Sequence, residues 1–262
     1  MYREGIGHPS RNSYKGAALM MRSDYKSVWT ALSESLSSAK MHVSGTEDEA
    51  IVERSGVGTS EFLLSHVGIH STDVVLEIGC GIGRVGKHLA GRCRRWIGAD
   101  VSPHMLKFAA ERLRDFSNVE FVELSRNDLR PINDNSIDVA YCTVVFMHLE
   151  SWDRYSYVKE AFRVLRPGGK LYVDNVNLCC DGGWAIFETH RKFSPAERPD
   201  HITVCSTPQE LQEYLKRAGF EQIESYAGEE LISLWGRKPS DHASKLTGIG
   251  GLGFGASEPP TN

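Results

Sequence analysis

One glycine-rich stretch constrains the fold more than any other part of the chain. Residues 73–78 form a short apolar run rich in β-branched side chains, which is typical of a buried parallel strand. Glycines follow at positions 79, 81 and 83, and a helical pattern begins directly after them. Glycine lets the main chain approach a ligand closely because no Cβ intervenes, and the first N–H groups of a helix lack partners. The stretch therefore predicts a nucleotide-type binding turn at the carboxyl end of a central strand.

Two classes of cofactor are compatible with this turn. Residues 81–86 read Gly-Ile-Gly-Arg-Val-Gly, which is a literal dinucleotide fingerprint, and an acidic residue, Asp100, ends the next predicted strand. A fingerprint of this kind is weak evidence on its own, so it does not by itself select an NAD(P)-dependent oxidoreductase. The choice between the cofactors depends on the rest of the chain.

The composition is that of an ordinary globular protein. The 262 residues are 40% hydrophobic and 24% charged, which suits one domain with appendages. The net charge of −4 gives no support for a nucleic-acid partner. We find no apolar run of membrane-spanning length and no apolar leader after Met1. Six cysteines without C-x-x-C spacing predict no metal site, and these features together predict a cytoplasmic location.

Helical patterns precede the first strand. Apolar residues from Tyr25 to Leu36 recur at helical spacing, and Thr46 with the acids after it is typical of a helix start. Ser60 is expected to open a further short helix. Residues 1–70 are therefore interpreted as an N-terminal helical segment. In a typical dinucleotide enzyme the fingerprint lies closer to the N-terminus.

Strands and helices alternate after the glycine turn. The further strand-like runs lie at residues 96–99, 119–122, 137–142 and 170–175. Helical patterns separate most of these runs, and a loop leads into the run at 137–142. This alternation predicts an α/β fold with a parallel, doubly wound sheet.

The carboxyl-terminal part has a different topology. Strand-like runs at residues 221–226 and 230–235 are joined by a connection too short for a parallel crossover, so they are predicted to form an antiparallel hairpin. A nicotinamide-binding fold continues with parallel strands instead. Residues 238–262 are rich in glycine, and we expect them to form a disordered tail.

The turn and the acid after it resemble one family closely. The pattern Glu77-x-Gly79-x-Gly81-x-Gly83 resembles motif I of the class I S-adenosylmethionine-dependent methyltransferases. Asp100 lies where that family has an acidic residue at the end of its second strand.

Three later segments extend the resemblance to roughly residues 70–236. Residues 131–138 are similar to the family's loop into the fourth strand. Residues 144–149 are similar to the apolar stretch after that strand, and residues 165–169 are similar to the turn before the fifth strand. The resemblance to small-molecule methyltransferases implies a seven-stranded, mostly parallel sheet closed by the hairpin. It also implies an N-terminal lid at residues 1–70 and a Rossmann-like domain at residues 71–237 with a substrate-side insert at residues 175–206. Gly86 then serves helix packing.

The resemblance assigns cofactor contacts to motif I and to the acid. The main chain at Gly79, Gly81 and Gly83 is expected to pass under the amino-acid and ribose portions of S-adenosylmethionine. Glu77 is expected to hold the turn and the cationic end of the methionine moiety, and a purely structural contact is its alternative. Asp100 is expected to accept hydrogen bonds from the ribose hydroxyls, with capping of the following helix as the alternative.

Further contacts are implied around the adenine and the sulfonium. Val101 is expected to pack on the adenine face. Asn127 or Asp128 is expected to bind the adenine amino group, and the choice stays open because the sequence departs here from the family's usual Gly-Asp pair. Thr143 lies where the family passes under the sulfonium, mostly through main-chain atoms.

Methyl transfer from a sulfonium is an in-line displacement, so alignment is the enzyme's main contribution and is worth roughly 7–11 kcal/mol. An oxygen nucleophile also gains from a base near neutral pH, for which histidine is suited. The candidate bases are His148, after the fourth strand, and His190, in the insert, where His201 also lies. Bracing of the loop is the alternative role for His148.

The sequence therefore predicts transfer of a methyl group from S-adenosyl-L-methionine to a small-molecule acceptor, at oxygen or nitrogen. We expect a monomer or homodimer without a metal, nucleic-acid or membrane partner. An NAD(P)-dependent oxidoreductase and a non-catalytic binding protein on the same fold are the alternatives. A thiol- or arsenic-handling enzyme, suggested by Cys179, Cys180 and Cys205, is disfavoured because adjacent cysteines are poor joint metal ligands.

Overall fold

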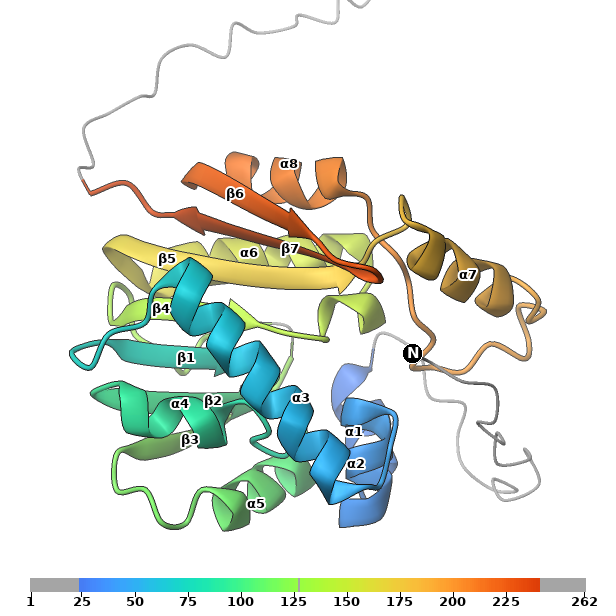
Figure 1. Ribbon diagram of the computed structural model, residues 1–262, viewed down its shortest axis with the longest axis horizontal. Helices are drawn as coiled ribbons and strands as arrows, with labels where there is room; N and C mark the ends of the chain where they lie inside the picture. The colour runs from blue at the N-terminus through green and yellow to red at the C-terminus, as the bar shows by residue number, and fades with distance from the viewer. Residues whose placement is uncertain (1–23, 127, 241–262) are drawn as a thin grey trace, which may run out of the picture.

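The computed structural model describes residues 24–126 and 128–240. Its centre is a seven-stranded sheet with the strand order β3-β2-β1-β4-β5-β7-β6 (Figure 1). The strands are β1 (Val74–Ile78), β2 (Arg95–Asp100), β3 (Val119–Glu123), β4 (Ile137–Cys142), β5 (Leu165–Val176), β6 (Glu221–Ala227) and β7 (Leu231–Arg237). Strands β1 to β5 pair in parallel, whereas β7 runs antiparallel to both β5 and β6. The predicted fold class and its closing hairpin are confirmed.

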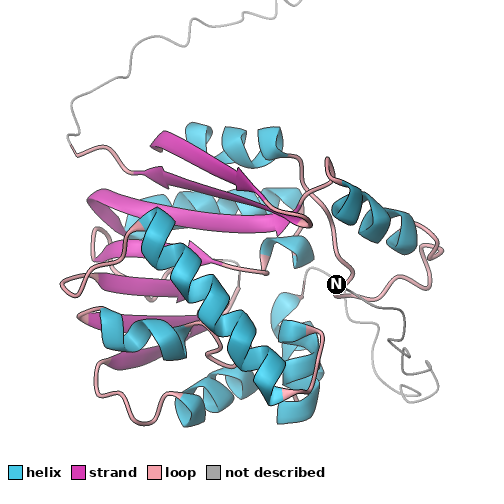
Figure 2. Ribbon diagram, viewed as in Figure 1, coloured by secondary structure: helices cyan, strands magenta, loops and turns pink. Residues whose placement is uncertain are grey.

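Helices cover both faces of the sheet (Figure 2). Those after β1 are α4 (Gly86–Leu89), α5 (Pro103–Arg112), α6 (Ser151–Val164), α7 (Asp181–His190) and α8 (Pro208–Ala218). Val74, Leu76 and Ile78 of β1 pack in the core that contains α6 and α8, while Val75 packs in the core that contains α4 and α5. Because β1 is buried on both faces, its sequence is a continuous apolar run apart from Glu77.

The N-terminal segment contains α1 (Tyr25–Leu32), α2 (Leu36–Ser44) and α3 (Glu49–Phe62), which continues into a π-helical turn (Leu63–Val67). Two expectations here are wrong. The first helix does not run on to Leu36, because Ser35 caps α2 by accepting a hydrogen bond from the Ser38 N–H. Ser60 does not start a helix, because its Oγ donates to the Val57 oxygen at 2.8 Å inside α3.

The helices α1 and α2 lie beyond the carboxyl ends of the parallel strands (Figure 1). The buried Ser33 and Ser102 hydroxyls are 2.7 Å apart and join the end of α1 to the start of α5. The Tyr25 hydroxyl donates to Asp153 Oδ2 at 2.6 Å and joins α1 to α6. These contacts hold the N-terminal helices over the carboxyl ends of the parallel strands.

The carboxyl-terminal boundaries differ in detail from the expectation. Lys238 is buried, and its ammonium group donates to the oxygens of Phe162 and Leu165 at 2.7 Å each, so ordered packing continues past residue 237. Residues 241–262 of the expected tail lie outside the described residues.

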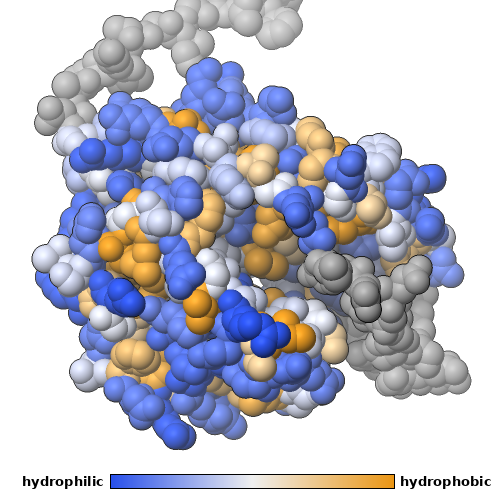
Figure 3. Space-filling view, viewed as in Figure 1, coloured by the Kyte–Doolittle hydropathy of each residue, from blue (hydrophilic) through white to orange (hydrophobic). Residues whose placement is uncertain are grey.

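The surface carries few large apolar side chains. On the face drawn in Figure 3, hydrophobic residues gather in small separate groups among hydrophilic ones. Trp184 and Phe187 of α7 are exposed and lie against each other, with ring centroids 5.2 Å apart. Within residues 24–126 and 128–240, no helix combines the length and the apolar character needed to cross a membrane.

Candidate active site

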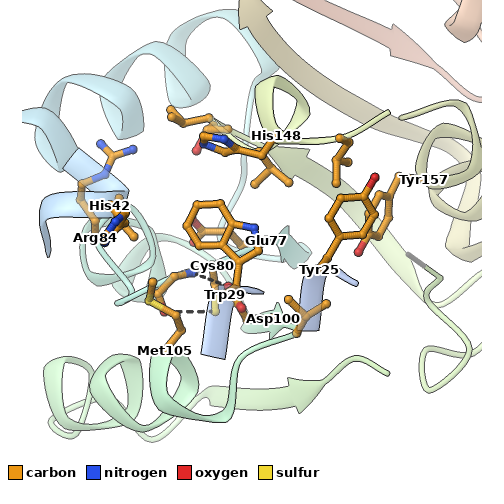
Figure 4. Close-up of a pocket in the computed structure, with 18 residues that line it drawn as sticks. Tyr25, Trp29, His42, Glu77, Cys80, Arg84, Asp100, Met105, His148 and Tyr157 are labelled. Atoms are coloured by element: carbon orange, nitrogen blue, oxygen red, sulfur yellow. Dashed lines mark hydrogen bonds between the residues drawn. The ribbon is translucent and has the colours of Figure 1, made fainter. Parts of the chain in front are cut away.

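A cavity opens at the carboxyl ends of β1, β2 and β4 (Figure 4). Its floor is the glycine turn after β1 together with Glu77 and Asp100, which belong to β1 and β2. One wall is the segment after β4, and α1 and α2 contribute Trp29 and His42 to the opposite side. The cavity therefore lies where open α/β sheets bind ligands.

The turn after β1 requires glycine at three positions. Gly79, Gly81 and Gly83 have φ values of 73°, 51° and 74°, in the left-handed region that disfavours residues with a Cβ. A Cβ on Gly79 would lie only 2.4 Å from Val145 Cγ2. Gly79 and Gly81 line the cavity, whereas Gly83 packs against α5 near Leu113 and is not among the lining residues.

The third glycine of the apparent dinucleotide fingerprint has a packing role. A Cβ on Gly86 would lie 2.2 Å from Cζ2 of the buried Trp96. Gly86 is therefore needed for the close approach of α4 to β2, as expected.

Asp100 ties the turn to the start of α5. Its Oδ2 accepts from the Gly81 N–H and its Oδ1 accepts from the Ser102 N–H, each at 2.9 Å. Burial raises the pKa of Asp100 to about 6, and the main-chain N–H groups oppose this rise. Each oxygen of a carboxylate can accept a second hydrogen bond, so the observed capping contacts leave acceptor capacity facing the cavity. Val101, the next residue, also lines the cavity.

Glu77 is buried beneath the turn. Its Oε2 accepts from the Tyr141 hydroxyl at 2.6 Å, and that hydroxyl accepts from Trp96 Nε1 at 3.0 Å. Burial raises the pKa of Glu77 to about 8, and the nearby charge of Arg84 opposes this rise. A second cation in the cavity would stabilise the ionised carboxylate further.

Arg84 brings a buried cation to the same cavity. Its Nη1 donates to Ser55 Oγ and Thr59 Oγ1 of α3 at 3.3 Å each, and its Nε has no partner among the described residues. A buried guanidinium with an unsatisfied N–H is suited to binding an anionic oxygen. Sequence reasoning missed this role, because a basic residue after a glycine turn is not diagnostic by itself.

The wall after β4 contains a strained residue. Thr143, Val144 and Val145 all line the cavity, and Val144 has a φ of 60°. This conformation costs a non-glycine residue about 1–3 kcal/mol. The Val144 N–H donates to Asp174 Oδ1 at 2.7 Å. Asp174, on β5, was also missed by sequence reasoning.

His148 lies at the same end of the cavity as the lid. Its ring is 4.9 Å from that of Trp29 in an edge-on arrangement, and its Nδ1 is 2.8 Å from the His201 main-chain oxygen. Since a carbonyl only accepts, Nδ1 carries the proton of this hydrogen bond. Figure 4 shows His148, Trp29 and Tyr25 around the same space.

The other predicted site residues lie elsewhere. His190, at the end of α7, is not among the residues that line the cavity. Asp128 does not line it either, and its Oδ2 is 3.2 Å from Arg130 Nε. Asn127 lies outside the described residues. None of residues 175–206 lines this cavity, and the insert reaches its rim through the contact of His201 with His148.

Metal coordination has no visible basis in the part of the chain that the structure describes. No group of three or more His, Cys, Asp and Glu side chains is arranged there to hold a metal ion.

Comparison with known proteins decides between the two cofactors. Residues 76–173 match the family model described as a methyltransferase domain. Residues 76–173 therefore form a methyltransferase domain, which agrees with the resemblance of the glycine turn to the class I S-adenosylmethionine-dependent methyltransferases. Thiol S-methyltransferase TMT1B from Homo sapiens is 31% identical over 154 residues, which are 57% of this chain and 61% of that protein. Phosphoethanolamine N-methyltransferase 1 from Arabidopsis thaliana is 30% identical over 129 residues, or 48% of this chain and 26% of that protein. This chain therefore spans less than two thirds of the length of either relative.

Solved structures share this fold. An S-adenosylmethionine-dependent methyltransferase from Thermotoga maritima has a TM-score of 0.57 and 21% identity, with 78% of this chain and all of that chain (100%) covered. Magnesium protoporphyrin IX methyltransferase from Synechocystis, solved with S-adenosylhomocysteine, has a TM-score of 0.55 and 14% identity, with 71% and 83% covered.

The residues of the cavity fit S-adenosylmethionine. Its ammonium group matches the buried carboxylate of Glu77, and its own carboxylate matches the guanidinium of Arg84 with the unpartnered Nε. The left-handed glycines provide main chain without Cβ atoms where the ligand must pass closely. S-adenosylmethionine is the cofactor of this family.

Replacement of Glu77 by glutamine tests the electrostatics of the site. The folded-state pKa of about 8 lies above the usual 4.5, so the wild-type protein without cofactor loses stability as the pH rises between these values. Glu77→Gln stays neutral and escapes this loss. The unfolding free energy of Glu77→Gln minus that of wild type should therefore increase with pH, by up to about 1.4 kcal/mol per pH unit. Urea unfolding from about pH 5 to about pH 8 measures both free energies.

Glu221→Gln, at an exposed position on β6, is the control for removal of a carboxylate. Parallel stability curves for Glu77→Gln and wild type would show that Glu77 is already ionised across this range.

Proposed function

We propose that this protein transfers a methyl group from S-adenosylmethionine to a small-molecule acceptor, at oxygen or nitrogen. The observation that carries the proposal is the cavity in which the glycine turn, Glu77 and Asp100 face an apolar and aromatic lid. Two named relatives act on a thiol and on phosphoethanolamine, so their names support a small acceptor without selecting one atom.

The cofactor contacts follow from the chemistry of the floor. Gly79 and Gly81 pass under the amino-acid and ribose portions, and Glu77 faces the ammonium group. Asp100 uses its remaining lone pairs to accept from the ribose hydroxyls, while Val101 packs on the adenine. Support comes from the position of all five residues in the lining of one cavity.

The remaining predicted contacts have less support. Thr143 lines the wall near the expected sulfonium position. The Asp128 carboxylate does not line the cavity and lies near Arg130. The adenine amino group is therefore more readily bound by a main-chain group or by a neighbouring residue than by this carboxylate. Gly83 contributes the shape of the turn rather than a contact.

The protein's part in catalysis is alignment and exclusion of water. The bound cofactor supplies an electrophilic methyl group on its sulfonium. Tyr25 and Trp29 close the cavity over this position, and alignment of this kind is worth roughly 7–11 kcal/mol. The hydrogen bond from His148 Nδ1 to the His201 oxygen both braces the loop and places the lone pair of the neutral ring on Nε2. His148 then takes the proton of an O–H or N–H acceptor.

An oxidoreductase fits the molecule less well. Residues 76–173 match the model of a methyltransferase domain, and the packing of Gly86 on Trp96 does not distinguish the two folds. The antiparallel β7 also replaces the parallel strand of a nicotinamide-binding fold. A non-catalytic binding protein would bind the cofactor in the same cavity but would transfer no methyl group to an acceptor.

Calorimetric competition tests the cofactor assignment. Titration with S-adenosylmethionine and with S-adenosylhomocysteine should each give saturable one-site binding, and excess NAD or NADPH should not displace either. Tight binding of NAD together with no binding of S-adenosylmethionine would overturn the proposal.

A histidine pair tests the catalytic role. Labelled S-adenosylmethionine and metabolite extracts first identify the acceptor that gains the methyl group. With that acceptor, His148→Gln should lower kcat by about a hundredfold or more, as expected for loss of a base, with little change in the KM for S-adenosylmethionine. His190→Gln, outside the cavity lining, should change kcat less than about threefold.

A bracing role for His148 would give a different pattern. The variant would then lose thermal stability and affinity while kcat stayed near the wild-type value.

A further inference from the structure

We propose that Asp174 is a positioning residue: its buried carboxylate holds residues 143–145, here called the β4 loop, in the conformation that forms the cofactor-binding wall. The inference rests on the proposed function, because it concerns the same cavity. None of the sequence motifs identified above includes Asp174.

The β4 loop is in a conformation that its sequence disfavours. Val144 has a φ of 60°, which is unfavourable for a β-branched side chain. Such a residue returns to an extended or right-handed conformation unless a neighbouring group holds it. The group that holds it here is the Asp174 carboxylate, which accepts from the Val144 N–H at 2.7 Å. A hydrogen bond of this length to a carboxylate is of the strong, charge-assisted kind.

Asp174 is itself firmly fixed. It lies on β5, which pairs with β4 on one side and with β7 on the other. Its Oδ2 accepts from the Tyr172 hydroxyl at 3.2 Å, and that hydroxyl is 2.9 Å from Ser233 Oγ on β7. The charge of Arg84 further stabilises the ionised carboxylate. The anchor of the β4 loop is therefore on an interior strand of the sheet and not in another loop.

The β4 loop in turn touches the glycine turn. All three of its residues line the cavity, and Val145 packs so closely on Gly79 that a Cβ there would lie 2.4 Å from Val145 Cγ2. The space for the cofactor is thus set by two main-chain segments, one after β1 and one after β4. Asp174 fixes the second segment relative to the first.

The position of Asp174 is costly for folding alone. It is 3% exposed, and burial of a carboxylate between strands opposes folding unless its hydrogen bonds compensate. An apolar residue would fill the sheet at lower cost, but it would leave the Val144 N–H without this acceptor. The cost is understandable if the carboxylate is kept for the shape of the cavity.

A double-mutant cycle on binding tests the proposal. Affinity for S-adenosylhomocysteine is measured by calorimetry for wild type, Asp174→Ala, Val144→Gly and the combined variant, with thermal unfolding in parallel. Asp174→Ala should weaken binding by about tenfold or more, because the β4 loop relaxes away from the cavity. In the Val144→Gly background the same change should weaken binding by less than about threefold, because glycine adopts the left-handed conformation without help.

Asn175→Ala is the matched control. Asn175 is the next residue of β5, is fully buried, and donates to Ser206 Oγ at 2.8 Å rather than to the β4 loop. It should lower the unfolding temperature while the affinity stays within about twofold of wild type. Asp174→Asn, which keeps a carbonyl acceptor for the Val144 N–H, should restore most of the affinity lost in Asp174→Ala.

Two results would overturn the proposal. One is wild-type affinity in a folded Asp174→Ala variant. The other is an equal loss of affinity in the Val144 and Val144→Gly backgrounds, which would mean that Asp174 contributes to stability only. If Asp174→Ala does not fold, the same cycle with Asp174→Asn decides: a small loss confined to the Val144 background supports the proposal, and equal losses contradict it. Failure of wild type to bind the ligand would instead refute the proposed function.

Discussion

The burial of three carboxylates, two that line the cavity and one behind its wall, is the constraint on which the site depends. Glu77, Asp100 and Asp174 come from β1, β2 and β5 and are all almost inaccessible to solvent. Burial raises their pKa values to about 8, about 6 and about 6. Main-chain N–H groups, tyrosine hydroxyls and the Arg84 cation offset part of this cost. The arrangement is understandable if a cationic ligand completes the compensation, and the sulfonium and ammonium groups of S-adenosylmethionine are such a ligand.

Two of these carboxylates connect the loops of the site to neighbouring helices and strands. Asp100 joins the glycine turn to α5, and Asp174 joins the segment after β4 to β5. The turn and that segment meet at Gly79 and Val145, so neither shifts without the other. The N-terminal helices are attached through the contact of Tyr25 on α1 with Asp153 on α6 and through the contact of Ser33 with Ser102 at the start of α5.

Much of the fold and part of the site follow from local sequence. The glycine turn, the position of Asp100 and the closing hairpin are set by spacing within short segments, and each is found as predicted. Arg84 and Asp174 were not found, because their roles depend on which strands and helices become neighbours. Ser60 was misread as a helix start, since a serine that bonds back within its own helix looks the same in sequence as a cap. His148 is expected near the reacting centre because it follows the fourth strand, and it lines the cavity, whereas His190 in the insert does not.

Proton release on cofactor binding tests the central claim most directly. If the ligand's positive charge completes the compensation of Glu77, the pKa of that carboxyl falls on binding from about 8 in the free protein. Calorimetric titration with S-adenosylmethionine at about pH 7, repeated in buffers of different ionisation enthalpy, should then show release of about one proton per site, and Glu77→Gln should abolish the release. Binding without proton release, or release that persists in Glu77→Gln, would contradict this account.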